Sequence, residues 1–226
     1  GLLPSFLSLN KVDIAAHTQR LLLDAIRDEL AGRPSRPRLL LYGESLGAKV
    51  QEAAVPDGPV DLDHYGVAGA LWVGTPGGQV ADRFHALCAG ESFTIDRPEQ
   101  IPSPMPSPRP RVWFLEHDGD PVVRFRPELL NQRPAWLPTD GTRGRNIPAS
   151  MAWKPGITWA QVLVDTLFAT NVKPGDFKSE GHDYRADLGA AVRAAFDLPA
   201  DEDTAARLES YLRAKEVERA HRIDSA

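Results

Sequence analysis

LLLYGESLGAKV, residues 39–50, contains a serine between two glycines directly after a run of apolar residues. The run 39–42 is too short for a helix and lacks polar alternation, so it predicts a strand covered on both faces, as in a parallel sheet. Residues 46–54 then predict a helix. A G-x-S-x-G motif between a strand and a helix is typical of a nucleophilic serine on a tight turn, whose glycines let strand and helix approach closely. The alternative is an ordinary turn with a helix-capping serine.

The same alternation of strand and helix recurs along the chain, which predicts an α/β fold with a mainly parallel sheet flanked by helices. Further strands are expected at residues 70–74 and 112–116, with 151–153 as a candidate fourth. Helices are expected at residues 10–31, 79–89, 158–170, 186–196 and 203–220. The proline-dense segment 98–110 and residues 131–149 are expected to be loops. We interpret residues 1–226 as one domain.

Composition narrows the classes of partner. The chain has 226 residues, 42% of them hydrophobic and 25% charged, and a formal net charge of −5, as in one soluble globular domain. It has no cluster of basic residues, which argues against a nucleic-acid partner. The single cysteine, Cys88, cannot form an intrachain disulfide and is expected to be a small buried residue. No apolar run approaches the roughly 18 residues of a membrane span, and the cellular compartment stays open. No cofactor and no metal are expected.

A nucleophilic serine needs a base to remove its proton and an acid to orient that base. In this architecture the chain order is serine, acid, histidine, and the acid follows a later strand. Asp120, in the segment HDGDPVV after the strand expected at 112–116, is the preferred acid. Asp118 is the alternative, and an Asx turn beside Gly119 is the non-catalytic interpretation of both aspartates.

His182 is the preferred base, because it lies in a polar loop before a helix, in the segment GHDY. Of the six histidines, only His182 and His221 follow Asp120, and His221 lies among charges near the end of a terminal helix. The others are expected to have packing or surface roles: His17 and His85 on helices, His64 in a loop, and His117 at a strand end beside the acid turn. Asp183 follows His182 too closely to orient it.

The segments YGESLGA, GALWVGTP, HDGDPVV and GHDY, in this order, resemble the α/β-hydrolase superfamily. With LPSFLS, RPAWL and MAWKPGITWAQV, the chain is similar over most of its length to a bacterial α/β-hydrolase family of poorly defined substrate. Members of that family typically carry the catalytic domain behind an N-terminal transmembrane region. The resemblance implies that Ser45 is the nucleophile, Asp120 the acid and His182 the base, and that the parent protein is membrane-anchored.

This fold binds the oxyanion with two backbone N–H groups, one from the residue after the nucleophile, here Leu46, and one from a loop after an upstream strand. Only 44 residues precede Ser45, and one helix is expected to fill about half of them. We therefore expect a partial, N-terminally truncated α/β-hydrolase fold. The strand at 39–42 should then have an open edge, which an upstream segment of the same protein would complete.

The predicted function is hydrolysis of a small-molecule or lipid ester through a Ser-His-Asp triad and an acyl-enzyme; the preference for an apolar acyl group rests on the resemblance. An acyltransferase with the same triad, or a non-catalytic hydrolase-like binding module, is the alternative. Trp136, Trp153 and Trp159 are candidates for an acyl pocket, with loop or core packing as the alternative. One departure from the superfamily pattern is the helix expected at 158–170, which separates His182 from any last strand and leaves its approach to Ser45 open.

Overall fold

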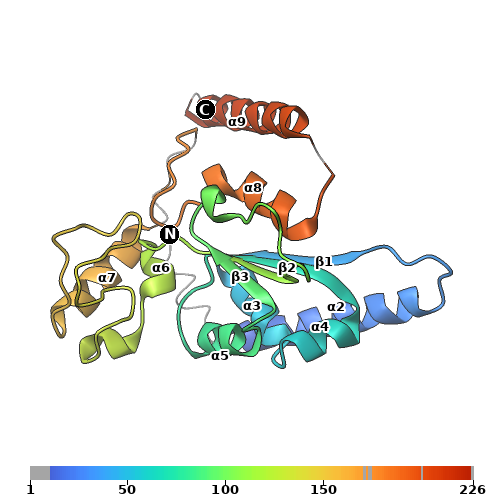
Figure 1. Ribbon diagram of the computed structural model, residues 1–226, viewed down its shortest axis with the longest axis horizontal. Helices are drawn as coiled ribbons and strands as arrows, with labels where there is room; N and C mark the ends of the chain where they lie inside the picture. Colours follow the sequence, from blue (N-terminus) through green and yellow to red (C-terminus); the bar gives the residue numbers. More distant parts are fainter. Residues whose placement is uncertain (1–10, 170–171, 173–174, 200, 225–226) are drawn as a thin grey trace.

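A four-stranded parallel sheet forms the centre of the chain in the computed structural model, which describes residues 11–169, 172, 175–199 and 201–224 (Figure 1). Its strands are β1 (Leu39–Glu44), β2 (Val67–Val73), β3 (Ser92–Ile95) and β4 (Val112–Leu115). Their spatial order is β1-β2-β4-β3, and each of the three pairings is parallel. The predicted α/β class is confirmed. Residues 10 and 170, the outer ends of two expected helices, lie outside the described residues.

Helices cover both faces of the sheet (Figure 1). The helices that share a hydrophobic core on one face are α2 (Val12–Ala31), α3 (Leu46–Ala54), α4 (Pro59–Tyr65) and α5 (Gln79–Leu87). The opposite face packs against α8 (Arg185–Phe196), and α9 (Glu202–Asp224) lies beyond α8. Shorter or peripheral elements are α6 (Pro121–Arg124), α7 (Ile157–Phe168) and the one-turn 3-10 helices η2 (Pro98–Gln100) and η3 (Pro127–Leu130). Because α6 begins just beyond the carboxyl end of β4 and contacts α7, both border that end of the sheet.

The alternation of side chains along the central strands explains the unbroken apolar runs in the sequence. On β2, Ala70 and Trp72 enter the core beneath α2 to α5, whereas Leu71 and Val73 enter the core beneath α8. All four are at most 1% exposed. A strand buried on both faces cannot use polar residues at either set of positions, which is why β2 and β4 lack polar alternation.

β1 is less covered than the sequence predicts. Leu41 is buried, but Tyr42 on the opposite face is 40% exposed, because α8 packs over β2 and β4. In the described part of the chain, β1 pairs with β2 and no strand lies along its other edge. The expectation that an upstream segment completes this edge stays a prediction.

Three local expectations are wrong. The fourth strand is β3, while residues 151–153 form a loop; β3 gains its hydrogen bonds by pairing with β4. His64 lies in α4, a short helix that begins with proline, and not in a loop. The proline-dense segment contains the single turn η2. Among the helices that the structure describes, none combines the length and apolar character required to cross a membrane.

Candidate active site

Ser45 lies on the turn between β1 and α3 with φ +51° and ψ −121°. A non-glycine residue in this region is strained, at a cost of about 1–3 kcal/mol, and such residues persist only where surrounding contacts hold them. Here the Ser45 N–H donates to the Val73 carbonyl of β2, 2.8 Å away. The turn therefore has the strained geometry of a nucleophile elbow.

The two glycines of the motif differ in what they do. A Cβ at Gly43 would lie 2.8 Å from both the Cα and the backbone N of Ala48, so only glycine lets α3 pack this closely on β1. A Cβ at Gly47 would meet nothing within 4 Å. The expectation that both glycines relieve crowding is therefore wrong for Gly47, because its side-chain position faces open space.

Leu46 is the first residue of α3, so its N–H has no acceptor within the helix. The amino end of a helix carries a partial positive charge, and its free N–H groups bind anions readily. The backbone of Leu46 is thus a donor beside Ser45 that can bind an oxyanion.

Asp120 lies just beyond β4 and is fully buried. Its Oδ1 accepts a hydrogen bond from Val122 N–H at 2.8 Å, which caps α6. Its Oδ2 accepts from Nδ1–H of His182 and from the hydroxyl of Tyr184, each at 2.6 Å. Three donors replace the water that this buried carboxylate has lost. The structure therefore pairs Asp120 with His182.

Asp118, the alternative acid, points elsewhere. Its Oδ2 accepts from the backbone N–H of Arg145 at 3.3 Å, and its Oδ1 lies 3.5 Å from Nη2 of Arg124. Asp183, next to His182 in the sequence, forms an ion pair with Arg185 at 2.7 Å. Neither carboxylate orients His182.

His182 reaches the sheet from the loop before α8, and this loop packs on the end of β2. A Cβ at Gly74, the residue after β2, would lie 2.9 Å from Cε1 of His182 and 2.5 Å from Cε2 of Tyr184. Gly74 follows Val73, whose carbonyl holds Ser45, so the serine turn and the histidine loop meet at the same strand end. The intervening α7 does not keep the histidine away from the sheet.

The electrostatics of Glu44 also connect the histidine to the serine turn. Burial raises the pKa of the Glu44 carboxyl, and the charge of His182 acts in the opposite direction. Glu44 immediately precedes Ser45, so His182 lies near that turn. Among the described residues, the Ser45 hydroxyl has no hydrogen-bond partner, so the structure joins the predicted acid and base directly but leaves the serine unbonded.

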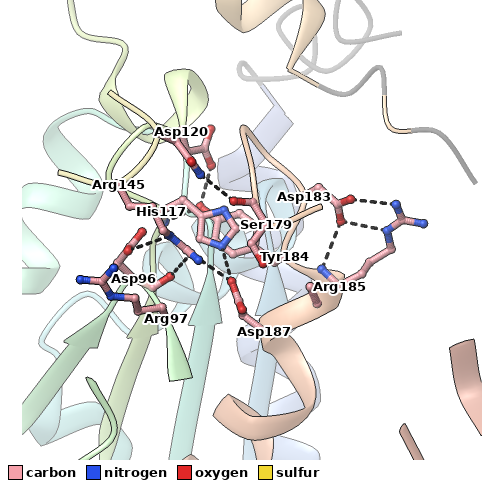
Figure 2. A network of polar contacts seen from close by, with 12 residues as sticks. Asp96, Arg97, His117, Asp120, Arg145, Ser179, Asp183, Tyr184, Arg185 and Asp187 are labelled. Carbon is pink, nitrogen blue, oxygen red and sulfur yellow. Dashed lines mark hydrogen bonds and ion pairs between the residues drawn. The ribbon is translucent and has the colours of Figure 1, made fainter. Parts of the chain in front are cut away.

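Sequence reasoning missed the contacts of two histidines near the end of β4, one of them fully buried and the other partly exposed. His117 is fully buried, with Nε2 3.0 Å from Oδ2 of Asp187 (Figure 2). Its Nδ1 lies 3.2 Å from the carbonyl oxygen of Gly181. His85 stacks on Phe114 at 3.7 Å between ring centroids, and its Nε2 lies 3.0 Å from Oε1 of Glu116. Tyr184, the last residue of GHDY, was also missed, although its position two residues after the histidine was the available signal.

Two cavities lie around these loops. One, of about 240 Å³, is lined by Gly181 and Asp183, which flank His182, and by Phe168 at the end of α7. The other, of about 300 Å³, is lined by Trp136 and Ile147 next to Asp118, among other residues of the same loop. Both have a mixture of apolar and polar walls.

The three tryptophans considered for an acyl pocket have different surroundings. Trp136 lines the larger cavity. Trp153 lies beneath the guanidinium of Arg133, 5.7 Å from it, and Trp159 lies 5.9 Å from Phe125. Trp153 and Trp159 therefore pack against loop residues.

The described residues hold no cluster of three or more histidine, cysteine, aspartate or glutamate side chains arranged to bind a metal ion. Cys88 is fully buried, and burial raises the pKa of its thiol to about 12, so it is a protonated packing residue.

The fold and the site define the class. This chain belongs to an alpha/beta-hydrolase family, whose model matches residues 1–87 and 89–208. No curated protein and no solved structure matches the chain. Family membership indicates hydrolase-type chemistry; the membrane anchor implied by the resemblance stays a prediction.

Proposed function

We propose that this protein is a serine hydrolase that cleaves a carboxylic ester through an acyl-enzyme. The observation that carries the proposal is the 2.6 Å contact between His182 Nδ1 and the fully buried Asp120, at the strand end where Ser45 forms its strained turn. The chain order serine, acid, histidine is the order of α/β-hydrolases.

In the proposed mechanism, Ser45 Oγ attacks the ester carbonyl carbon while Nε2 of His182 takes the hydroxyl proton. Asp120 keeps the imidazole proton on Nδ1 and stabilises the imidazolium that forms. The Leu46 N–H donates to the oxyanion. His182 then protonates the departing alcohol, and a water molecule, deprotonated by the same nitrogen, releases the acid and restores Ser45.

An apolar acyl group is supported by the exposed face of α7, which carries large apolar side chains. One of them, Phe168, also lines the cavity formed in part by Gly181 and Asp183, the sequence neighbours of His182. The large apolar side chains on α7 are Ile157, Val164, Leu167 and Phe168, which are 41–62% exposed. Apolar surface of this kind is favourable for binding a hydrocarbon chain.

Hydrolysis of p-nitrophenyl acetate, butyrate and laurate tests the proposal. We expect turnover that falls by at least about 10³-fold in Ser45→Ala, because the nucleophile is lost. Ser35→Ala, an exposed serine in the connector before β1, is the matched control and should keep full activity. Product analysis with an added alcohol separates hydrolysis from acyl transfer. Activity that survives in Ser45→Ala would refute the assignment.

A further inference from the structure

The carboxylate oxygen of Asp120 that faces His182 has a second donor. Oδ2 of Asp120 accepts from the Tyr184 hydroxyl at 2.6 Å, the same distance as from His182 Nδ1. The Tyr184 oxygen in turn accepts the backbone N–H of His117 at 3.1 Å. The hydroxyl therefore accepts one hydrogen bond from His117 and donates one to Asp120, and these two bonds fix its orientation.

The ring of Tyr184 is held from two sides. It stacks on the His117 imidazole with centroids 4.0 Å apart and an interplanar angle of 24°. On another side it leaves no room for a Cβ at Gly74. His117 itself contacts the carboxylate of Asp187 (Figure 2) and the carbonyl oxygen of Gly181. Tyr184 therefore cannot swing away from Asp120 without disturbing buried neighbours.

A buried charge network extends behind His117. Asp187 also accepts from Nη2 of Arg145 at 3.0 Å, and Nε of Arg145 lies 2.9 Å from Oδ2 of Asp96. Asp96 Oδ1 accepts the backbone N–H of Asp118 in the acid turn at 3.0 Å. Burial raises the pKa of Asp187, but hydrogen bonds from His117 and Arg145 outweigh it, so the net pKa is lowered and Asp187 stays ionised. The network fixes the acid turn and the histidine loop relative to each other.

We propose that Tyr184 is a positioning residue that sets the basicity of His182 by donating to the Asp120 oxygen that faces it. A hydrogen bond to a carboxylate draws charge from it, and a carboxylate with less charge stabilises a neighbouring imidazolium less. With the Tyr184 hydrogen bond in place, the His182 imidazolium gives up its proton at lower pH, so His182 can act as a base over a wider pH range. This inference rests on the proposed function, in which His182 is the base.

Tyr184 can play this role throughout the working pH range. Burial, followed by the charge of Asp120, raises the pKa of its hydroxyl well above the usual value, so it remains a donor. Other titratable groups surround the site, and Tyr184→Phe leaves each of their side chains in the sequence. They are Glu44, Glu116, His117, Asp183 and Asp187.

The test is the pH dependence of the rate at which a fluorophosphonate labels the full chain. In Tyr184→Phe, which keeps the ring, we expect the midpoint of the acid limb to rise by about 0.5 to 1 pH unit, a fraction of the effect of one charged hydrogen bond. In a chain with 3-fluorotyrosine at position 184, a stronger donor, the midpoint should fall. Tyr65→Phe, at the opposite end of β2, is the matched control and should keep the original midpoint.

The outcomes separate the two proposals. Equal midpoints in the original chain and in Tyr184→Phe, with Ser45-dependent labelling intact, would overturn the role of Tyr184 alone. An original chain without Ser45-dependent labelling would overturn the proposed function and this inference with it. If Tyr184→Phe does not fold, the fluorinated chain decides, because a midpoint that stays or rises there contradicts the inference.

Discussion

Glu52, on the helix that begins after Ser45, should make the stability of the fold depend on pH. Its side chain is 1% exposed; Oε1 accepts from the Thr75 hydroxyl at 2.7 Å, and Oε2 has no partner among the described residues. Burial raises its pKa from an ordinary value of 4.5 to about 7, against the hydrogen bond from Thr75 and the charge of His85. The folded state therefore holds a proton that the unfolded chain has lost between these two values.

The sign and size of the effect follow from this linkage. Because the folded state binds more protons than the unfolded state in this window, stability falls as pH rises from about 4.5 to 7 and levels off above. At ~1.4 kcal/mol for each pKa unit, the Glu52 contribution should decrease by about 2 to 3 kcal/mol between pH 5 and pH 8. Glu52→Gln removes the titration and should remove this decrease.

Urea denaturation at pH 5 and pH 8 measures the difference in unfolding free energy between Glu52→Gln and the original chain. We expect the unfolding free energy of Glu52→Gln, measured relative to the original chain, to be about 2 to 3 kcal/mol higher at pH 8 than at pH 5. Glu128→Gln, an exposed position on η3, is the matched control and should follow the original chain. A difference for Glu52→Gln that is the same at both pH values would refute the reasoning.

Two further substitutions test the site and its turn. Asp120→Asn should lower kcat for ester hydrolysis by on the order of 10³ to 10⁴-fold with the fold retained, since an amide facing His182 Nδ1 favours the wrong tautomer; an unchanged kcat would contradict the assignment of the acid. Gly43→Ala should destabilise the chain by about 2 kcal/mol or more in urea denaturation, because its Cβ collides with the backbone of Ala48, whereas Gly47→Ala should stay within about 1 kcal/mol; equal effects would contradict the packing at the turn.

The sequence predicts the central part of the fold because burial on both faces leaves a clear pattern. β2 and β4 have unbroken apolar runs. The apolar spacing of α2 predicts a helix but not its buried side, because Leu21 and Leu22 are exposed and Leu23 is buried. β3 escapes prediction because it has only four residues, of which Ile95 alone is buried, and because it is ordered by pairing with β4. Residues 151–153 have an apolar pattern like that of a strand but lie in a loop.

The candidate site could be predicted as far as chain order and local motifs reach. The positions of Asp120 and His182 after Ser45 predict an acid and a base, and the structure pairs these two side chains. The donor from Tyr184 to Asp120 joins residues 64 positions apart, and no local pattern reports such a contact. The same holds for His117, whose burial against Asp187 depends on how α8 packs over β4.

The most direct test of the account is to locate the covalent adduct that a fluorophosphonate forms with the full chain. Mass spectrometry of the digested protein should find one phosphonyl group on the peptide that contains Ser45. The adduct should be absent from Ser45→Ala and formed much more slowly in His182→Ala, because the hydroxyl is attacked only when a base takes its proton. An adduct on another residue, or labelling that persists in Ser45→Ala, would contradict the claim that Ser45 is the nucleophile.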